Sequence, residues 1–145
     1  MFTHLLLPTD GSELSEIAIR KGIQFAKEIN ARVTGFHVVP EFHVFTYRPE
    51  MLEETREEFT RDARKRAAQY LSVIEKVASE AGVRCSTGYA TNAHPHEAII
   101  RAAEENCCDL IMMASHGRKG VHSLLIGSET HKALTHTKIP VLVYR

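Results

Sequence analysis

The sequence has no apolar stretch near 18 residues, which is about the length that a helix needs to cross a bilayer. Its opening residues, MFTHLLLPTDGS, contain only a short apolar run with no basic leader before it, which is not the pattern of a signal peptide. We therefore expect no membrane span and a cytoplasmic location, and we interpret these residues as an ordinary first strand.

The sequence also has few cysteines and no formal net charge. The three cysteines, Cys85, Cys107 and Cys108, lack C-x-x-C spacing, which indicates buried or idle thiols in a reducing cytosol; a redox role for the adjacent pair is the alternative. The 18 basic and 18 acidic side chains cancel, which argues against a nucleic-acid-binding protein that depends on overall charge. A local site for one small anionic ligand is not excluded.

Two common nucleotide signatures are missing as well. No Gly-Lys-Ser or Gly-Lys-Thr follows a glycine and four spacer residues, so there is no P-loop, and no G-x-G-x-x-G opens the first helix. The His94-Pro95-His96 segment invites a metal interpretation, but no third ligand is adjacent and structural zinc usually needs four. We expect no dedicated metal site.

What the chain does contain is a regular alternation of strand and helix patterns. Because the strands are continuous apolar runs and alternate with helices, we predict an α/β fold with a parallel sheet between two layers of helices, a three-layer α/β/α sandwich. No shift in composition marks a second domain, so one domain is predicted over residues 1–145. Strands are expected at 4–8, 32–39, 83–90, 110–114 and 139–144, and helices at 12–30, 52–81, 95–106 and 129–136.

The first predicted helix shows apolar residues at helical spacing, which should define its buried face. These residues are Leu14, Ile17, Ala18, Phe25 and Ile29, and Lys21 is the one polar residue at the same spacing.

The segment ASHGRKGVHSLLIGSE, residues 114–129, is where we expect function to be concentrated. It joins a strand to a helix through a loop of about a dozen residues, where roughly 2–6 are usual. Gly117, Gly120 and Gly127 let backbone approach a ligand, and the helix start at Ser128 offers free N–H groups and a partial positive charge. This fits a phosphate site, although the glycines can equally be turn residues beside a plain helix cap.

Ligands of parallel sheets bind beyond the carboxyl ends of the strands, where the strand order reverses. Residues 9–12, 38–40 and 114–128 are expected to meet there. Asp10 in this group has two interpretations: it can accept hydrogen bonds from a ribose, or it can form a capping pair with Glu13 at the first helix, where Ser12 is also a candidate cap.

At this point the sequence resembles the universal stress protein family over its whole length. LLLPTDGSE resembles the first strand and turn of the family, HVVPE the end of its second strand, and KIPVLVYR its final strand. The most specific match is to the family's nucleotide signature: Gly, two residues, Gly, nine residues, then Gly-Ser or Gly-Thr. Ala114, Gly117, Gly127 and Ser128 occupy the matching positions.

The resemblance implies a Rossmann-like sheet of order 3-2-1-4-5 that binds ATP, with Mg²⁺ or Mn²⁺ carried on the phosphates rather than in a protein cage. Gly117, Gly127 and Ser128 would hold the phosphates, Asp10 the ribose, and the Val38 backbone the adenine. The other residues expected to line the nucleotide are Pro8, Thr9, Ala114, His116, Arg118 and Glu129.

Ala114 departs from the signature, whose first position is glycine. If this position needs a positive φ, alanine costs roughly 1 kcal/mol or more; if it needs only a small side chain, alanine fits. His116 and His122 can contact phosphate or be solvated loop residues, and Arg118 and Lys119 can neutralise phosphate charge or have no specific role.

Three functions remain open. The first is a cytosolic stress-response sensor or adaptor that binds ATP and acts through a protein partner. The second is a slow ATP hydrolase, for which Asp10 and His116 are the only candidate groups and no dedicated motif is present. The third is a stress protein that binds partners without nucleotide. In the first case we expect Gly127→Val to abolish ATP binding while the fold remains.

The last strand predicts an oligomer. Residues 141–144 are apolar and lie next to the end of the chain, and an open apolar edge strand invites aggregation. Pairing with a second copy removes that liability, so we expect a twofold homodimer through the C-terminal strand.

Overall fold

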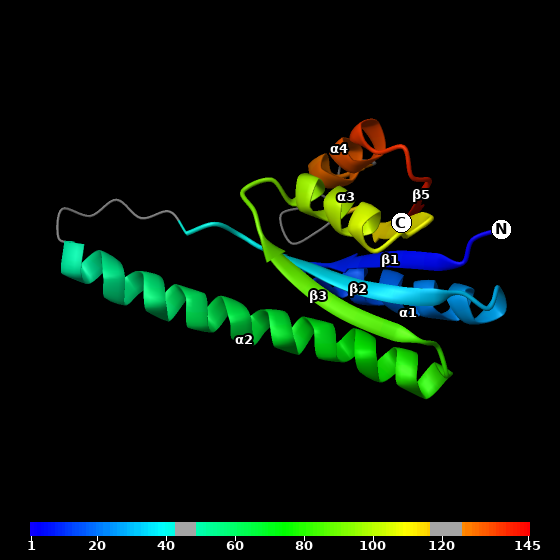
Figure 1. Cartoon of the computed structure of the whole chain (residues 1–145), viewed down its shortest axis with the longest axis horizontal. Coiled ribbons are helices and arrows are strands. Elements are labelled where there is room, and N and C mark those ends of the chain that lie inside the picture. Colours follow the sequence, from blue (N-terminus) through cyan, green and yellow to red (C-terminus); the bar gives the residue numbers. More distant parts are fainter. Residues whose placement is uncertain (43–48, 117–125) are drawn as a thin grey trace.

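The computed structural model describes residues 1–42, 49–116 and 126–145, with side chains described outside 49–54 (Figure 1). None of the helices in these ranges combines the length and the apolar character of a membrane span. The elements in chain order are β1 (His4–Thr9), α1 (Glu13–Glu28), β2 (Arg32–Val39), α2 (Pro49–Ala81), β3 (Cys85–Thr91), α3 (Pro95–Glu105), β4 (Leu110–Ala114), α4 (Ser128–His136) and β5 (Val141–Tyr144).

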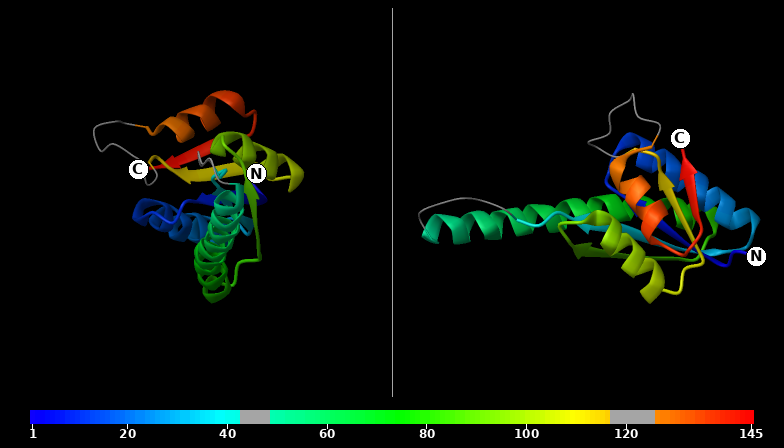
Figure 2. Two further views of the ribbon diagram at one scale, coloured as in Figure 1. Left: turned by 90° about the vertical axis from the view of Figure 1, so that its left-hand side faces the viewer. Right: turned by 90° about the horizontal axis from the view of Figure 1, so that it is seen from above.

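The five strands form one parallel sheet of order β3-β2-β1-β4-β5, so the predicted alternation, fold class and strand order are confirmed. α1 and α2 cover one face, and α3 and α4 cover the other (Figures 1 and 2). The sheet is therefore the middle of three layers.

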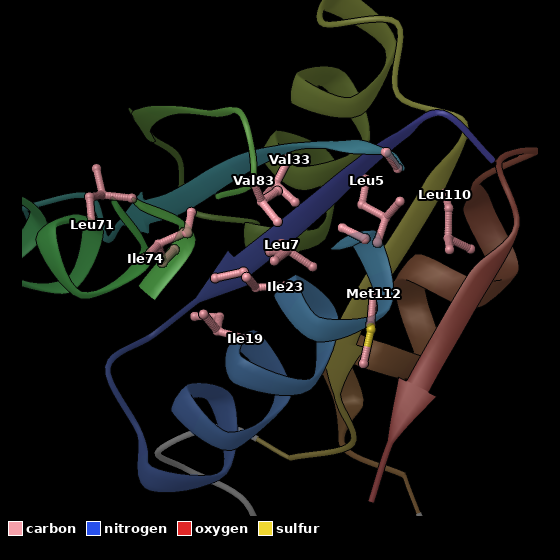
Figure 3. Close-up of a cluster of buried hydrophobic side chains, with 13 residues drawn as sticks. Leu5, Leu7, Ile19, Ile23, Val33, Leu71, Ile74, Val83, Leu110 and Met112 are labelled. Atoms are coloured by element: carbon pink, nitrogen blue, oxygen red, sulfur yellow. The ribbon is translucent and has the colours of Figure 1, made fainter. Parts of the chain in front are cut away.

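The central strand β1 sends side chains into both cores. Leu5 and Leu7 pack with α1 and α2 in the cluster drawn in Figure 3, and Leu6 packs in the opposite cluster against α3 and α4. All three leucines are 0% exposed. Full burial of one such side chain contributes about 1.5–3 kcal/mol, so this short segment anchors both layers.

The buried face of α1 differs from the predicted one. Ile17 and Ile29 are 38% and 36% exposed, so assigning them to the buried face was wrong. Small residues decide the orientation: a Cβ on Gly22 would lie 2.7 Å from Leu7 Cδ2, so the helix backbone lies directly on β1 there. The residues that are buried are Ser15, Ala18, Ile19, Gly22, Ile23 and Ala26.

Three helices end in the same way before the next strand begins. Asn30, Gly82 and Cys107 follow α1, α2 and α3 with φ of 56°, 74° and 53°, the left-handed conformation of a helix C-terminus. After α3, the N–H of Cys108 donates to the carbonyl of Ala103 at 2.8 Å, the long hydrogen bond of the Schellman motif. The turns at the amino end of the sheet are thus fixed by backbone bonds.

A buried histidine lies at this same amino end. His4 is 4% exposed, and its Nε2 lies 2.7 Å from Thr34 Oγ1. Burial, and then the nearby Arg32 cation, hold the pKa of His4 below its ordinary value, although Asp109 opposes them. Burial likewise raises the pKa of the neighbouring Cys108 thiol to about 11, which is consistent with an idle core cysteine.

The lowered pKa of His4 predicts a loss of stability in mild acid. Since the unfolded chain takes up a proton near pH 6.5 that the folded chain resists, the free energy of unfolding should fall as the pH drops below about 6.5. His4→Gln should make this fall smaller between pH 7.5 and 5.5 in urea unfolding. The exposed His131→Gln is the control and should match the wild type; equal falls in all three proteins would contradict the prediction.

Candidate functional site

The strand order reverses at β1, which has β2 on one side and β4 on the other. β1 pairs with β2 along its whole length, from His4 to Thr9. With β4, the ladder covers only Leu5–Leu110 and Leu6–Ile111, near the amino end. The carboxyl ends of β1 and β4 are therefore not joined by a ladder, which is the place where parallel sheets admit ligands.

The turn from β1 into α1 is held by side-chain hydrogen bonds. Asp10 Oδ1 accepts from the N–H of Ser12 at 2.9 Å, and Ser12 Oγ accepts from the N–H of Ser15 at 3.2 Å. Ser12 is thus the N-cap of α1, and Asp10 shapes the turn that leads to it. The cap of α1 is therefore Ser12 and not Asp10. Contact of Asp10 with a ribose stays a prediction.

Two aromatic side chains from other elements cover this turn. His37, on β2, donates through Nδ1 to the Thr9 carbonyl at 2.8 Å, and its ring meets Tyr70 of α2 edge-on at 5.1 Å between centroids. Gly11 has φ of 78°, and a Cβ there would lie 2.3 Å from the Tyr70 ring. Neither Tyr70 nor His37 was among the residues that sequence reasoning predicted to line the site.

Ala114 ends β4 in ordinary backbone geometry. Outside glycine, the described residues with positive φ are Asn30 and Cys107, so Ala114 does not need the freedom of glycine. The residue is 8% exposed, and its carbonyl accepts from Thr130 Oγ1 at 2.9 Å. The departure from the signature therefore costs no backbone strain, which favours the small-side-chain alternative.

The start of α4 is fastened to the end of β4 through Gly127. The N–H of Gly127 donates to the Ser115 carbonyl at 2.6 Å, and a Cβ on Gly127 would lie 2.8 Å from that same oxygen. Gly127 is the N-cap of α4 and has no side chain with which to cap it. The amides of residues 128–130 have no partner within their own helix, and the Ser128 side chain is exposed.

His116 contributes an unsatisfied polar atom to the same place. Its Nδ1 lies 3.0 Å from Ser115 Oγ, and its Cδ2 would lie 3.8 Å from a Cβ on Gly127. Its Nε2 is buried, and no described residue hydrogen-bonds to it. Because buried polar atoms are almost always paired, this atom suits a ligand oxygen. Gly117 and Arg118, also predicted to bind nucleotide, lie outside the described residues.

Glu129 reaches towards α3. Its Oε2 accepts from the N–H of His96 at 3.0 Å and lies 3.2 Å from His96 Nδ1, while Oε1 lies 3.3 Å from Lys132 Nζ. Burial alone would raise the pKa of Glu129, but these donors outweigh it and hold the pKa below its ordinary value. Sequence reasoning placed Glu129 against the nucleotide and missed this link to His96.

The remaining predicted residues lie on the strands that lead to the site. Pro8 pairs with Phe36 and Val38 pairs with Ala90; both Pro8 and Val38 are half-buried. Within the described ranges, no group of three or more histidine, cysteine or acidic side chains is arranged to hold a metal ion.

A model of the universal stress protein family matches residues 1–145. The chain belongs to the universal stress protein family. Universal stress protein YxiE of Bacillus subtilis is 33% identical to it, and the match covers 100% of both chains. MJ0577 of Methanocaldococcus jannaschii is 28% identical over 100% of this chain and 96% of its own length.

Solved structures of the family have the same fold. The structure of MJ0577 matches with a TM-score of 0.85 at 30% identity, covering 99% of this chain and 95% of that one. A universal stress protein from Archaeoglobus fulgidus, solved in complex with dAMP, matches with a TM-score of 0.66 at 16% identity, covering 100% and 98%. The second likeness concerns the fold alone.

The close approach of Gly127 to Ser115 changes the expectation for substitutions at this glycine. Because any Cβ meets the Ser115 carbonyl, Gly127→Val would disturb the backbone as well as a ligand, so it does not test binding alone. We expect Gly127→Ala to lower the free energy of unfolding by about 1–3 kcal/mol in urea. Gly88→Ala is the matched control, because its Cβ would meet only Phe36 Cδ2 at 4.0 Å. Equal stabilities of the two variants would contradict the contact.

Proposed function

We propose that this chain binds an adenine nucleotide, ATP in the first instance, beyond the carboxyl ends of β1 and β4, and acts as a cytosolic stress-response sensor or adaptor. The observation that carries the proposal is the N-terminus of α4, which begins without a capping side chain at the point where the strand order reverses. Free amides and the helix dipole at such a place attract phosphate.

The residues around α4 suggest a division of roles. The amides of the first turn and the Ser128 hydroxyl donate to phosphate oxygens, and His116 Nε2 gains the partner that it lacks within the described residues. Asp10, just after the end of β1, would accept hydrogen bonds from the ribose, and the backbone of Val38 would contact the adenine. Mg²⁺ or Mn²⁺ would travel on the phosphates, since these residues supply no cage.

The choice of an adenine nucleotide rests on the family's nucleotide signature, which Gly117, Gly127 and Ser128 match and in which Ala114 replaces the first glycine. The geometry of Ala114 supports it, because the alanine adopts the strand conformation without strain. The Archaeoglobus fulgidus relative, which holds dAMP, is consistent with the ligand class but does not decide the number of phosphates.

A substitution at Ser128 separates binding from folding. Ser128→Asp places a carboxylate in the first turn of α4, where it favours the helix dipole but repels phosphate. We expect it to keep or raise the thermal stability and to weaken binding of Mg-ATP at least tenfold by calorimetry. Ser128→Asn is the control, because asparagine has the shape of aspartate without its charge. It should bind Mg-ATP with an affinity within a few-fold of the wild type.

The outcome for the wild type decides between the functions. Nucleotide released on denaturing freshly purified protein, identified by mass spectrometry, or a saturable titration with Mg-ATP supports the proposal. Wild-type affinity in Ser128→Asp would rule out the α4 N-terminus as the phosphate site. A wild-type protein that carries no nucleotide and does not bind Mg-ATP would leave the partner-binding function.

We also propose that two copies pair through β5. This strand is at the edge of the sheet, and its Leu142 is 37% exposed, as is Leu134 on the adjacent α4. Pairing buries these side chains and satisfies the free edge.

The dimer is tested by sedimentation at micromolar concentration. We expect the wild type to sediment as a dimer and Leu142→Asp as a monomer, because the added carboxylates would face a second copy across the interface. Ile17→Asp, on the equally exposed Ile17 of α1, should remain a dimer. A monomeric wild type would refute the proposal.

A further inference from the structure

We propose that His96 and Glu129 form a proton-linked pair that makes anion binding at the start of α4 sensitive to pH, with tighter binding in mild acid. The inference rests on the proposed function, since it concerns the same phosphate site. It starts from a contact that has no part in the phosphate binding proposed above. The carboxylate of Glu129, in the first turn of α4, accepts a hydrogen bond from the first turn of α3.

The two helices lie side by side on one face of the sheet (Figures 1 and 2). The hydrogen bonds between Glu129 and His96 join their N-terminal ends. His94 is the N-cap of α3 and makes no side-chain capping bond. Glu129 supplies that missing acceptor, because its Oε2 receives the N–H of His96. Glu129 thus caps a helix other than its own, and the cap fixes where its charge lies.

That charge lies close to the proposed phosphate site. Glu129 is the second residue of α4, and Ser128 beside it is the first. A carboxylate in the first turn of a helix competes with any other anion for the same amides and the same dipole. The more the charge of Glu129 is neutralised, the more favourably a phosphate group binds.

The neutralising groups come from both helices. On α4, the Lys132 Nζ lies 3.3 Å from Glu129 Oε1. On α3, the His96 side chain is 11% exposed and its Nδ1 lies 3.2 Å from the carboxylate. The other titratable rings that face His96 are His136 of α4, at 5.4 Å between centroids, and His94 at the start of its own helix, at 6.2 Å.

Protonation of His96 changes the charge without breaking this contact. In the neutral ring that suits a carboxylate acceptor, Nδ1 carries the proton and Nε2 is bare. Uptake of a proton at Nε2 leaves the Nδ1–H bond to Glu129 in place and adds one positive charge to the pair. Lowering the pH from 8 to 6 favours this proton uptake and should therefore favour anion binding, and binding should in turn favour proton uptake.

The test is the affinity for Mg-ATP at pH 6.0 and pH 8.0, measured by calorimetry. For each protein, the quantity compared is the ratio of the affinity at pH 6.0 to that at pH 8.0. Because the charges interact across one helical turn with screening by the solvent, we expect this ratio to be about two- to fivefold larger in the wild type than in His96→Gln. His94→Gln is the matched control, because His94 is exposed and is not among the described contacts of Glu129; it should keep the wild-type ratio. Any effect of pH on the nucleotide itself is common to all three proteins and cancels.

A second variant separates charge from geometry. Glu129→Gln keeps an oxygen that can accept from the His96 N–H but removes the negative charge. If the charge opposes phosphate, this variant should bind Mg-ATP at pH 8.0 about two- to fivefold more tightly than the wild type. If Glu129 only joins the helices, affinity will stay the same or fall, and the electrostatic role is refuted.

The two levels of the proposal fail differently. A wild type that binds no Mg-ATP at either pH overturns the proposed function and the pair together. Binding with the same pH ratio in wild type and His96→Gln overturns the pair alone. Thermal unfolding of every variant shows that the comparison is made between folded proteins.

Discussion

The structure depends on a central strand that has no face towards water. Leu5, Leu6 and Leu7 of β1 are all 0% exposed, which requires a helical layer on each side of the sheet. With right-handed connections, the chain must place β2 and β3 on one side of β1 and β4 and β5 on the other to cover both faces. The reversal of strand order at β1, and therefore the position of the candidate site, follows from burying these side chains.

Sequence reasoning succeeded where large apolar residues alone decide the structure and failed where small residues do. The strand Leu110–Ala114 was predicted with its observed ends, because its run of apolar residues fits no solvated element. The buried face of α1 was misassigned, because its spacing pattern counts Ile17 and ignores Gly22. A residue without a side chain contributes nothing to hydrophobic periodicity, yet it permits the closest approach of two backbones.

The candidate site was predictable in its local part only. The helix start at Ser128 and the close approach at Gly127 follow from one continuous motif. The effect of alanine at 114 depended on a φ angle, which residue type does not fix. His37 and the His96–Glu129 link were missed, since each contact joins elements far apart in the chain, the latter across 33 positions, and no spacing within one element reports it.

The connections at the two ends of the sheet are built differently. At the amino end, α1, α2 and α3 each finish in the left-handed conformation and pass into the next strand through a few residues closed by main-chain hydrogen bonds, with little tolerance for a change in length. At the carboxyl end, the connections differ in length and are held by side chains such as Asp10 and Thr130. Substitutions in the loops at the carboxyl end, which contact ligands, can therefore leave unchanged the turns at the amino end that set the register of the sheet. Ligand specificity and fold can thus vary independently.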